Sequence, residues 1–187
     1  MTSDDRPEVY AVGARRYPER FDDFGWMRDD VPVLSRSEVM RVGETYRAAL
    51  RIPDPRLDIA LRRLNAAMIR EEPADAVLDC TIGLEVLLGD DDSQATSWKL
   101  RLRAAALVSL ASGVAKGEET HQAVKRLYGI RSAIVHGASG RKPVDAAAGR
   151  AAAISVLRDV LRAAIANPIY IDPAEIDRRL LMGFTPP

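Results

Sequence analysis

Three features of the sequence predict an all-α fold. Hydrophobic residues make up 47% of the 187 residues and aromatic residues only 5%, a balance typical of helices that pack through Ala and Leu. Apolar residues recur every three or four positions along most of the chain. Gly and Pro fall mostly at the edges of these segments. We therefore expect one helical domain at residues 35–187, with its core at about 56–167, and an irregular arm at residues 1–34.

Start and stop signals predict a bundle of about five helices, with a short helix before it and another after it. Ser35 and Glu38 form a capping box before the first helix. Gly113 and Gly117 bracket a turn. The segment 73–88 is apolar nearly all round, which predicts the central helix. The expected helices lie at about 36–51, from 56 onward, at 73–88, 98–112, 118–136 and 145–166, and from 172 onward.

The stretch LYGIRSAIVHG, residues 127–137, combines an apolar stripe with two polar residues. Arg131 lies on that stripe, where packing favours an aliphatic side chain. Because a guanidinium stays charged and is costly to bury alone, Arg131 needs a buried partner, a cleft or a subunit interface. His136 follows about 140° round the helix and about 7.5 Å along it, so the two side chains flank one groove. The stripe consists of Val124, Leu127, Tyr128, Ile134 and Val135.

A second stripe of mostly small residues runs beside the first. It consists of Gly129, Ser132, Ala133 and His136. Small side chains let another backbone come close. A histidine at a helix end, before a glycine, is placed to titrate near neutral pH. An arginine and a histidine at such a surface together suggest phosphate chemistry.

Two carboxylates interrupt the apolar central helix. Asp79 and Glu85 are six positions apart and therefore about 240° round the helix from one another, so each needs its own partner. We expect Glu85 to pair with a basic side chain of a neighbouring helix, either Arg131 or one of Arg101 and Arg103. Such a pair either fixes the helix register or supports a catalytic role, and the sequence leaves both open.

Basic residues are balanced by acidic ones over the whole chain. Because there are 27 of each and the net charge is zero, nucleic-acid binding needs a local basic patch. Lys99, Arg101 and Arg103 alternate along the start of one helix, as either a basic ridge or a solvated face. Arg141 and Lys142 lie in a loop that either holds a phosphate or is an ordinary turn. The candidate phosphate-binding residues are Arg101, Arg103, Arg141 and Lys142.

Other classes of site find little support in the sequence. The single cysteine, Cys80, lies in an apolar run and is expected in the core of a protein from the reducing cytoplasm. No apolar run approaches the roughly 20 residues of a membrane span, and the amino terminus lacks a signal-peptide pattern. No zinc-spaced cluster, glycine-rich phosphate loop or Ser/His/Asp constellation is present, so no metal or cofactor is expected.

Arg131, four intervening residues and His136 match the R-x4-6-H signature of HEPN domains, and the surroundings resemble the Apea-like branch of that family. The resemblance covers about residues 57–140. Its more specific part is an ordered set of features along the chain. These are Arg70, Asp79, the pair Leu84 and Glu85, the basic turn from Lys99 to Arg103, and the final RSAIVHG.

The resemblance implies a homodimeric helical bundle in which motifs meet across the interface, and a metal-independent endoribonuclease of toxin–antitoxin, abortive-infection or antiphage systems. Arg131 and His136 would then be catalytic, with Ser132, Glu85 and Tyr128 shaping the site, and RNA and an antitoxin or defence protein as partners. Many active members carry Asn, Asp or His where this chain has Ser132. Two alternatives remain: a non-catalytic HEPN module that binds RNA, a nucleotide or a partner protein, and a purely structural role for the motif.

Overall fold

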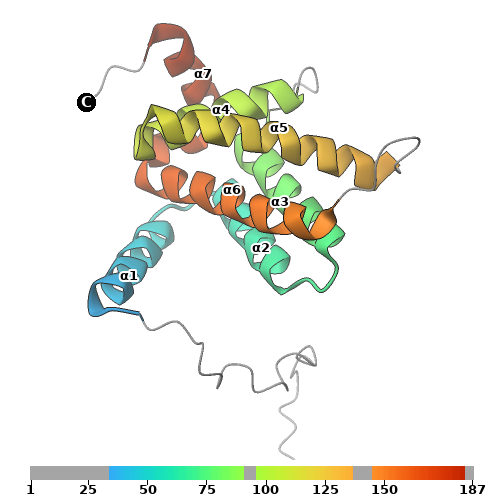
Figure 1. The fold of residues 1–187 in the computed structure, drawn as a ribbon. Coiled ribbons are helices and arrows are strands. Elements are labelled where there is room, and N and C mark those ends of the chain that lie inside the picture. The colour runs from blue at the N-terminus through green and yellow to red at the C-terminus, as the bar shows by residue number, and fades with distance from the viewer. Residues whose placement is uncertain (1–33, 91–95, 137–144, 184–187) are drawn as a thin grey trace, which may run out of the picture. The chain divides into compact units, whose positions relative to one another are not determined.

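The structure, a computed structural model, describes residues 34–90, 96–136 and 145–183, and every regular element in these ranges is helical (Figure 1). This confirms the all-α prediction. The α-helices are α1 (Arg36–Leu50), α2 (Pro55–Ile69), α3 (Pro73–Leu88), α4 (Thr96–Ser112), α5 (Val114–His136), α6 (Ala146–Ala166) and α7 (Pro173–Met182), with a 3₁₀ turn, η3 (Pro168–Ile171), before α7. No described helix has both the length and the apolar character needed to cross a membrane.

Polar side chains cap the start of several of these helices. Glu38 and Ser35 form the expected capping box, in which the Ser35 N–H donates to the Glu38 carboxylate at 2.7 Å. Asp145 accepts a hydrogen bond from the N–H of Ala148 at the start of α6, and Asp172 accepts one from Ala174 at the start of α7. These caps satisfy N–H groups that have no partner within their own helix.

Helix α3 is the centre of the bundle, as its sequence predicts. Nine of its residues are buried, and it packs against both α2 and α6. Cys80 is fully buried among them, which confirms its place in the core. Leu84 and Leu157 are also fully buried, in α3 and α6, and side chains of this size contribute about 2 kcal/mol each when they leave water. Because α3 also carries Glu85, its position determines which side chains of α5 can contact that carboxylate.

Helices α4 and α5 pack side by side along the bundle and are joined at Gly113, whose φ is 88°. The expected start of the motif helix at 118 is wrong, because α5 begins at Val114 and Gly117 lies within it. A Cβ on Gly117 would lie 1.8 Å from Ser109 Oγ and 2.7 Å from the Ala105 carbonyl oxygen. Gly117 therefore permits the close approach of α5 to α4, and the chain turns within a single residue.

Some apolar residues that the periodicity places inward are exposed. Val135, on the predicted core stripe of α5, is 53% exposed. Figure 1 shows the last turns of α5 reaching past α3, so this end of the helix has few neighbours to cover it. Leu110 of α4 and Met68 of α2 are exposed as well. Helical spacing predicts which residues share a face, but not where the neighbouring helices end.

The contacts divide the chain into residues 1–40 and 41–187, and helices α2 to α7 all belong to the second unit. The arm predicted at residues 1–34 lies outside the described residues, except for Leu34. Within the second unit, Ala48 and Ala49 at the end of α1 and Ile52 just after it pack against the core.

Candidate functional site

Arg131 lies on α5 and faces α3. Its Nη2 atom is 3.5 Å from Glu85 Oε1, and the two side chains are 36% and 28% exposed. Of the three partners expected for Glu85, the structure selects Arg131. The half-buried pair supplies the counter-charge that an arginine on a core stripe requires.

Tyr128 completes this arrangement one turn earlier on α5. Its hydroxyl donates a hydrogen bond to the same Glu85 oxygen at 3.0 Å. The Arg131 guanidinium carbon lies 5.9 Å from the centre of the Tyr128 ring, within reach of a cation–π interaction. Burial, and then the charge of Glu85, raise the pKa of the Tyr128 hydroxyl far above its usual value. Tyr128 is therefore a hydrogen-bond donor at every physiological pH.

The set of Glu85, Tyr128 and Arg131 is called here the Glu85 cluster. The Arg131 guanidinium interacts with both other members, with the Glu85 carboxylate through an ion pair and with the Tyr128 ring through a cation–π contact. A guanidinium carries five N–H donors and only one of its nitrogens approaches Glu85, so donors remain for an anion on the exposed side. The negative charge of Glu85 partly offsets that of Arg131, which weakens the attraction of the site for phosphate.

His136 is the last residue of α5, and its side chain is exposed. It makes no hydrogen bond or ion pair with any residue that the structure describes. A cleft of about 1280 Å³ lies elsewhere, between α4, α6 and the first half of α5, and its lining includes His121 instead of His136. The His136 side chain is therefore exposed and lies outside this cleft.

The stripe of small residues on α5 is equally open. Gly129 and Ser132 are exposed and Ala133 is half-buried. A Cβ on Gly129 would meet no atom within 4 Å. This surface has room for another chain, and the expected subunit contact there stays a prediction.

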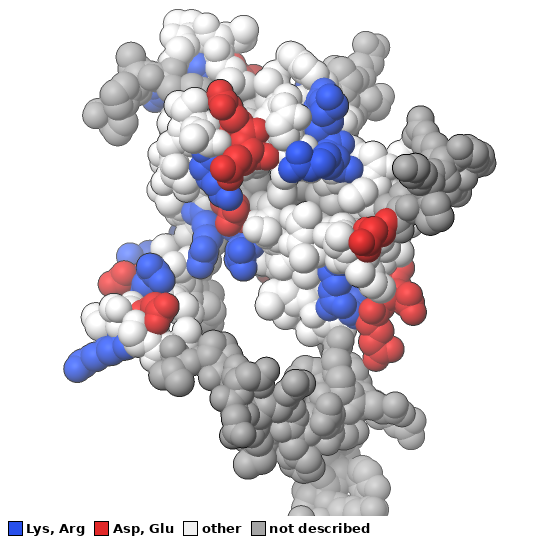
Figure 2. Space-filling model, viewed as in Figure 1, with Lys and Arg blue, Asp and Glu red and all other residues white. Residues whose placement is uncertain are grey.

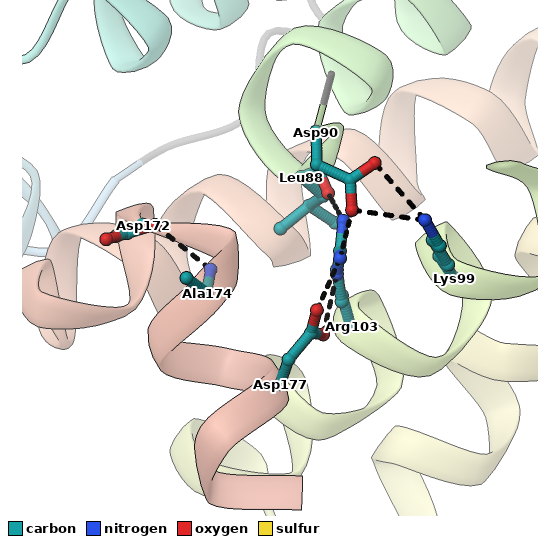
Figure 3. A network of polar contacts seen from close by, with 7 residues as sticks. All are labelled: Leu88, Asp90, Lys99, Arg103, Asp172, Ala174 and Asp177. Atoms are coloured by element: carbon teal, nitrogen blue, oxygen red, sulfur yellow. Dashed lines mark hydrogen bonds and ion pairs between the residues drawn. The ribbon is translucent and has the colours of Figure 1, made fainter. Parts of the chain in front are cut away.

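Arg103 belongs neither to a basic ridge nor to a solvated face at the start of α4, because it is buried and only 2% of its side chain is exposed. Figure 3 shows its guanidinium between two carboxylates. Nε and Nη2 donate to the two oxygens of Asp177 at 2.8 and 2.5 Å, and Nη1 donates to the Leu88 carbonyl at 2.7 Å. Nη2 also donates to Asp90, and this bond lowers the pKa of the Asp90 carboxyl. Arg103 therefore joins α4 to α7 and to the end of α3.

The other basic residues at the start of α4 are partly buried. Lys99 contacts Asp90 at 3.4 Å, beside Arg103. Arg101 is half-buried, and its Nε has no hydrogen-bond partner among the residues that the structure describes. Arg141 and Lys142 lie outside the described residues.

Asp79 has its own partners, as its position on α3 predicts. Its two oxygens accept hydrogen bonds from Arg63 Nη1 at 2.9 Å and from Arg70 Nε at 2.8 Å. The bond to Asp79 raises the pKa of Arg70. This carboxylate is 5% exposed and both arginines come from α2, so the cluster ties α2 to α3. Nowhere in the described residues do three or more His, Cys, Asp or Glu side chains gather as metal ligands would.

Sequence reasoning missed two basic residues of α5. Lys125 and Arg126 are both exposed, and no acidic residue occurs anywhere from residue 120 to residue 144. The signal was therefore present as a local excess of positive charge on the same helix as the motif. The overall balance of charge concealed it.

The fold and these side chains define an all-α bundle in which a polar cluster links its central helix to a long outer helix. Comparison of the chain with models of protein families, with curated proteins and with solved structures finds no match.

Proposed function

We propose that this protein is a metal-independent endoribonuclease of the HEPN type, with Arg131 and His136 as its catalytic residues. The observation that best supports the proposal is the Glu85 cluster. It holds the Arg131 guanidinium in place on α5 while part of that group stays exposed, and the same helix ends in the exposed imidazole of His136. A fixed cation near a titratable base is the minimum that phosphodiester transfer needs.

In this reaction the His136 imidazole accepts the proton of a ribose 2′-hydroxyl. The 2′-oxygen attacks the adjacent phosphorus, and the bond from phosphorus to the 5′-oxygen breaks as a second imidazole gives that oxygen a proton. Arg131 stabilises the additional negative charge on the phosphoryl oxygens in the transition state. The products are a 2′,3′-cyclic phosphate and a 5′-hydroxyl.

The proposed enzyme is a homodimer. A base and an acid both assist the transfer, and α5 offers one histidine at the motif, since His121 lies fifteen residues earlier, about 22 Å away along the axis. A second chain whose motif faces His136 would supply the other imidazole and would enclose the site. RNA is the proposed substrate. An antitoxin or defence-system protein is the proposed partner, as in toxin–antitoxin and antiphage systems.

A second candidate function is a non-catalytic module that binds RNA, a nucleotide or a protein. It is favoured by the exposure of His136 and by the presence of Glu85 beside Arg131, which lowers the positive potential at the site. A third candidate is a purely structural motif, because the ion pair between Arg131 and Glu85 also ties α5 to α3.

The test uses His121 as the matched control. Wild-type protein, Arg131→Ala, His136→Ala and His121→Ala are incubated with single-stranded and structured RNA in EDTA, and the product ends are analysed. The enzyme is supported if wild-type protein produces cyclic phosphate ends, if Arg131→Ala and His136→Ala do not, and if His121→Ala still does. Equal cleavage by all four proteins shows a contaminating nuclease, and binding without cleavage supports the module. Circular dichroism of Arg131→Ala detects the unfolding that a structural role requires.

A further inference from the structure

The exposed side of α5 forms a continuous line of residues that ends at His136. Exposed positions recur along the helix at spacings of three and four, and they are Glu118, Gln122, Lys125, Gly129, Ser132 and His136. Arg126, next to Lys125, is also exposed. The part of this line from Lys125 to His136, with Arg126, is called here the α5 ridge.

The α5 ridge is basic although the protein as a whole is neutral. No acidic residue lies between Glu119 and the end of α5. Lys125 and Arg126 form no ion pair with any described residue, whereas Lys116, at the start of the helix, is paired with Asp159. Figure 2 shows Lys and Arg side chains gathered over the middle of α5. An anion that approaches this helix therefore meets uncompensated charge in its middle.

The ridge is also unobstructed between its basic pair and its histidine. Gly129 and Ser132 lie between them, and there is no atom within 4 Å of the place where a Cβ of Gly129 would be. His136 is eleven positions after Lys125, which is about 16 Å along the helix axis. A few nucleotides of an extended strand cover this length.

We propose that Lys125 and Arg126 are positioning residues that bind phosphates of a single-stranded RNA and align it along the α5 ridge toward His136. A single strand is favoured because in-line attack by a 2′-hydroxyl requires an unstacked nucleotide, and an A-form duplex holds its nucleotides stacked. Lys125 acts as a point charge and Arg126 as a planar fork of donors. The direction toward His136 rests on the proposed function, but the binding of RNA to the ridge does not.

The test measures binding without cleavage. A short fluorescent single-stranded RNA is titrated with His136→Ala protein, and with the same protein carrying Lys125→Gln and Arg126→Gln, over a range of salt concentrations. The matched control carries Arg158→Gln and Arg162→Gln, two exposed arginines of α6. They flank Asp159, whose pairing with Lys116 places them near the opposite end of α5 from His136. Both double variants lose the same charge.

Loss of two phosphate contacts should weaken binding about 25-fold near 0.1 M salt and should reduce the salt slope of log K by about 1.4. The control should bind like its parent. Equal losses in both double variants, or no binding by the parent, would overturn the ridge. The inference would also be overturned if duplex RNA, or an acidic protein added as a competitor, bound the protein more tightly than the single-stranded RNA does.

A cleavage assay with the native His136 separates this inference from the proposed function. If RNA binding still depends on Lys125 and Arg126 but no RNA is cleaved, the inference about the α5 ridge is supported and the proposed endoribonuclease function is contradicted. If the Lys125 and Arg126 substitutions change neither the cleavage nor the affinity for RNA, the proposed endoribonuclease function is supported and the inference about the α5 ridge is contradicted.

Discussion

Arg103 of α4 and Asp177 of α7 are 74 residues apart in the chain and form a two-point hydrogen-bonded ion pair, with Nε and Nη2 on the two carboxylate oxygens. The arginine is buried and the aspartate is nearly half exposed. The pair is therefore the polar part of the contact that holds α7 on the bundle, and losing one partner leaves a cation in the interior.

Asp177→Asn should destabilise the protein by about 2–3 kcal/mol. Breaking a buried pair typically costs more, but Arg103 keeps its bonds to Asp90 and to the Leu88 carbonyl. Urea unfolding measures the change. Asp58→Asn is the control, because its pair with Arg62 is exposed on both sides and should contribute no more than about 1 kcal/mol. Equal effects of the two substitutions would contradict this account of Arg103.

The same network predicts a pH dependence. The Arg103 hydrogen bond lowers the pKa of Asp90 in the folded state, so the carboxylate contributes stability above its unfolded pKa of about 3.9, and this contribution is lost as the pH falls through the folded value. Unfolding free energies between pH 6 and pH 3 should therefore fall more steeply for wild type than for Asp90→Asn. Parallel curves would mean that Asp90 titrates alike in both states.

Gly117→Ala should destabilise the protein by about 1–3 kcal/mol, although alanine normally strengthens a helix. The added Cβ would overlap Ser109 Oγ, which can rotate away, and the Ala105 carbonyl, which belongs to the backbone of α4 and cannot. Gly129→Ala on the same helix is the control and should stabilise by up to about 1 kcal/mol, because its Cβ would enter open space. Thermal unfolding compares the two. If Gly117→Ala instead stabilised the protein, α4 and α5 would have to lie farther apart at this point than the structure shows.

Local patterns predicted the elements well, because caps, glycines and apolar spacing act within a few residues. The all-α class, the central place of α3 and the separate partners of Asp79 and Glu85 all follow from helical geometry in the sequence. The predicted start of α5 was wrong, because the sequence alone does not distinguish a glycine inside a helix from a glycine in a turn until the neighbouring helix is known.

The position of Arg103 could not be predicted, because its partners lie 13 and 74 residues away in the chain. A pattern of alternating basic residues assigns arginine to solvent by default, and only tertiary structure shows the carboxylates that draw it inward. The prediction that Val135 faces the core was wrong for a related reason, since α5 reaches past the helices that would cover this residue. The Glu85 cluster was partly predictable, because a charge on a core stripe limits its partner to a few candidates.

Glu85→Gln distinguishes a phosphate-binding role for Arg131 from a structural one. The glutamine side chain has the same shape, and its carbonyl can still accept the Tyr128 hydrogen bond, but the charge that offsets Arg131 is removed. If Arg131 binds phosphate, RNA should bind several-fold more tightly to Glu85→Gln in a His136→Ala background, because the potential at the guanidinium rises.

This gain should disappear when Arg131→Ala is added, since the two substitutions then act through one missing cation. Stability should fall by no more than about 1 kcal/mol, because the pair is part-exposed. Fluorescence anisotropy and urea unfolding of the four proteins in this cycle give both quantities. A loss of stability with unchanged RNA affinity would mean that Arg131 serves only to tie α5 to α3. A gain that survives Arg131→Ala would mean that the RNA responds to the overall charge and does not contact this guanidinium.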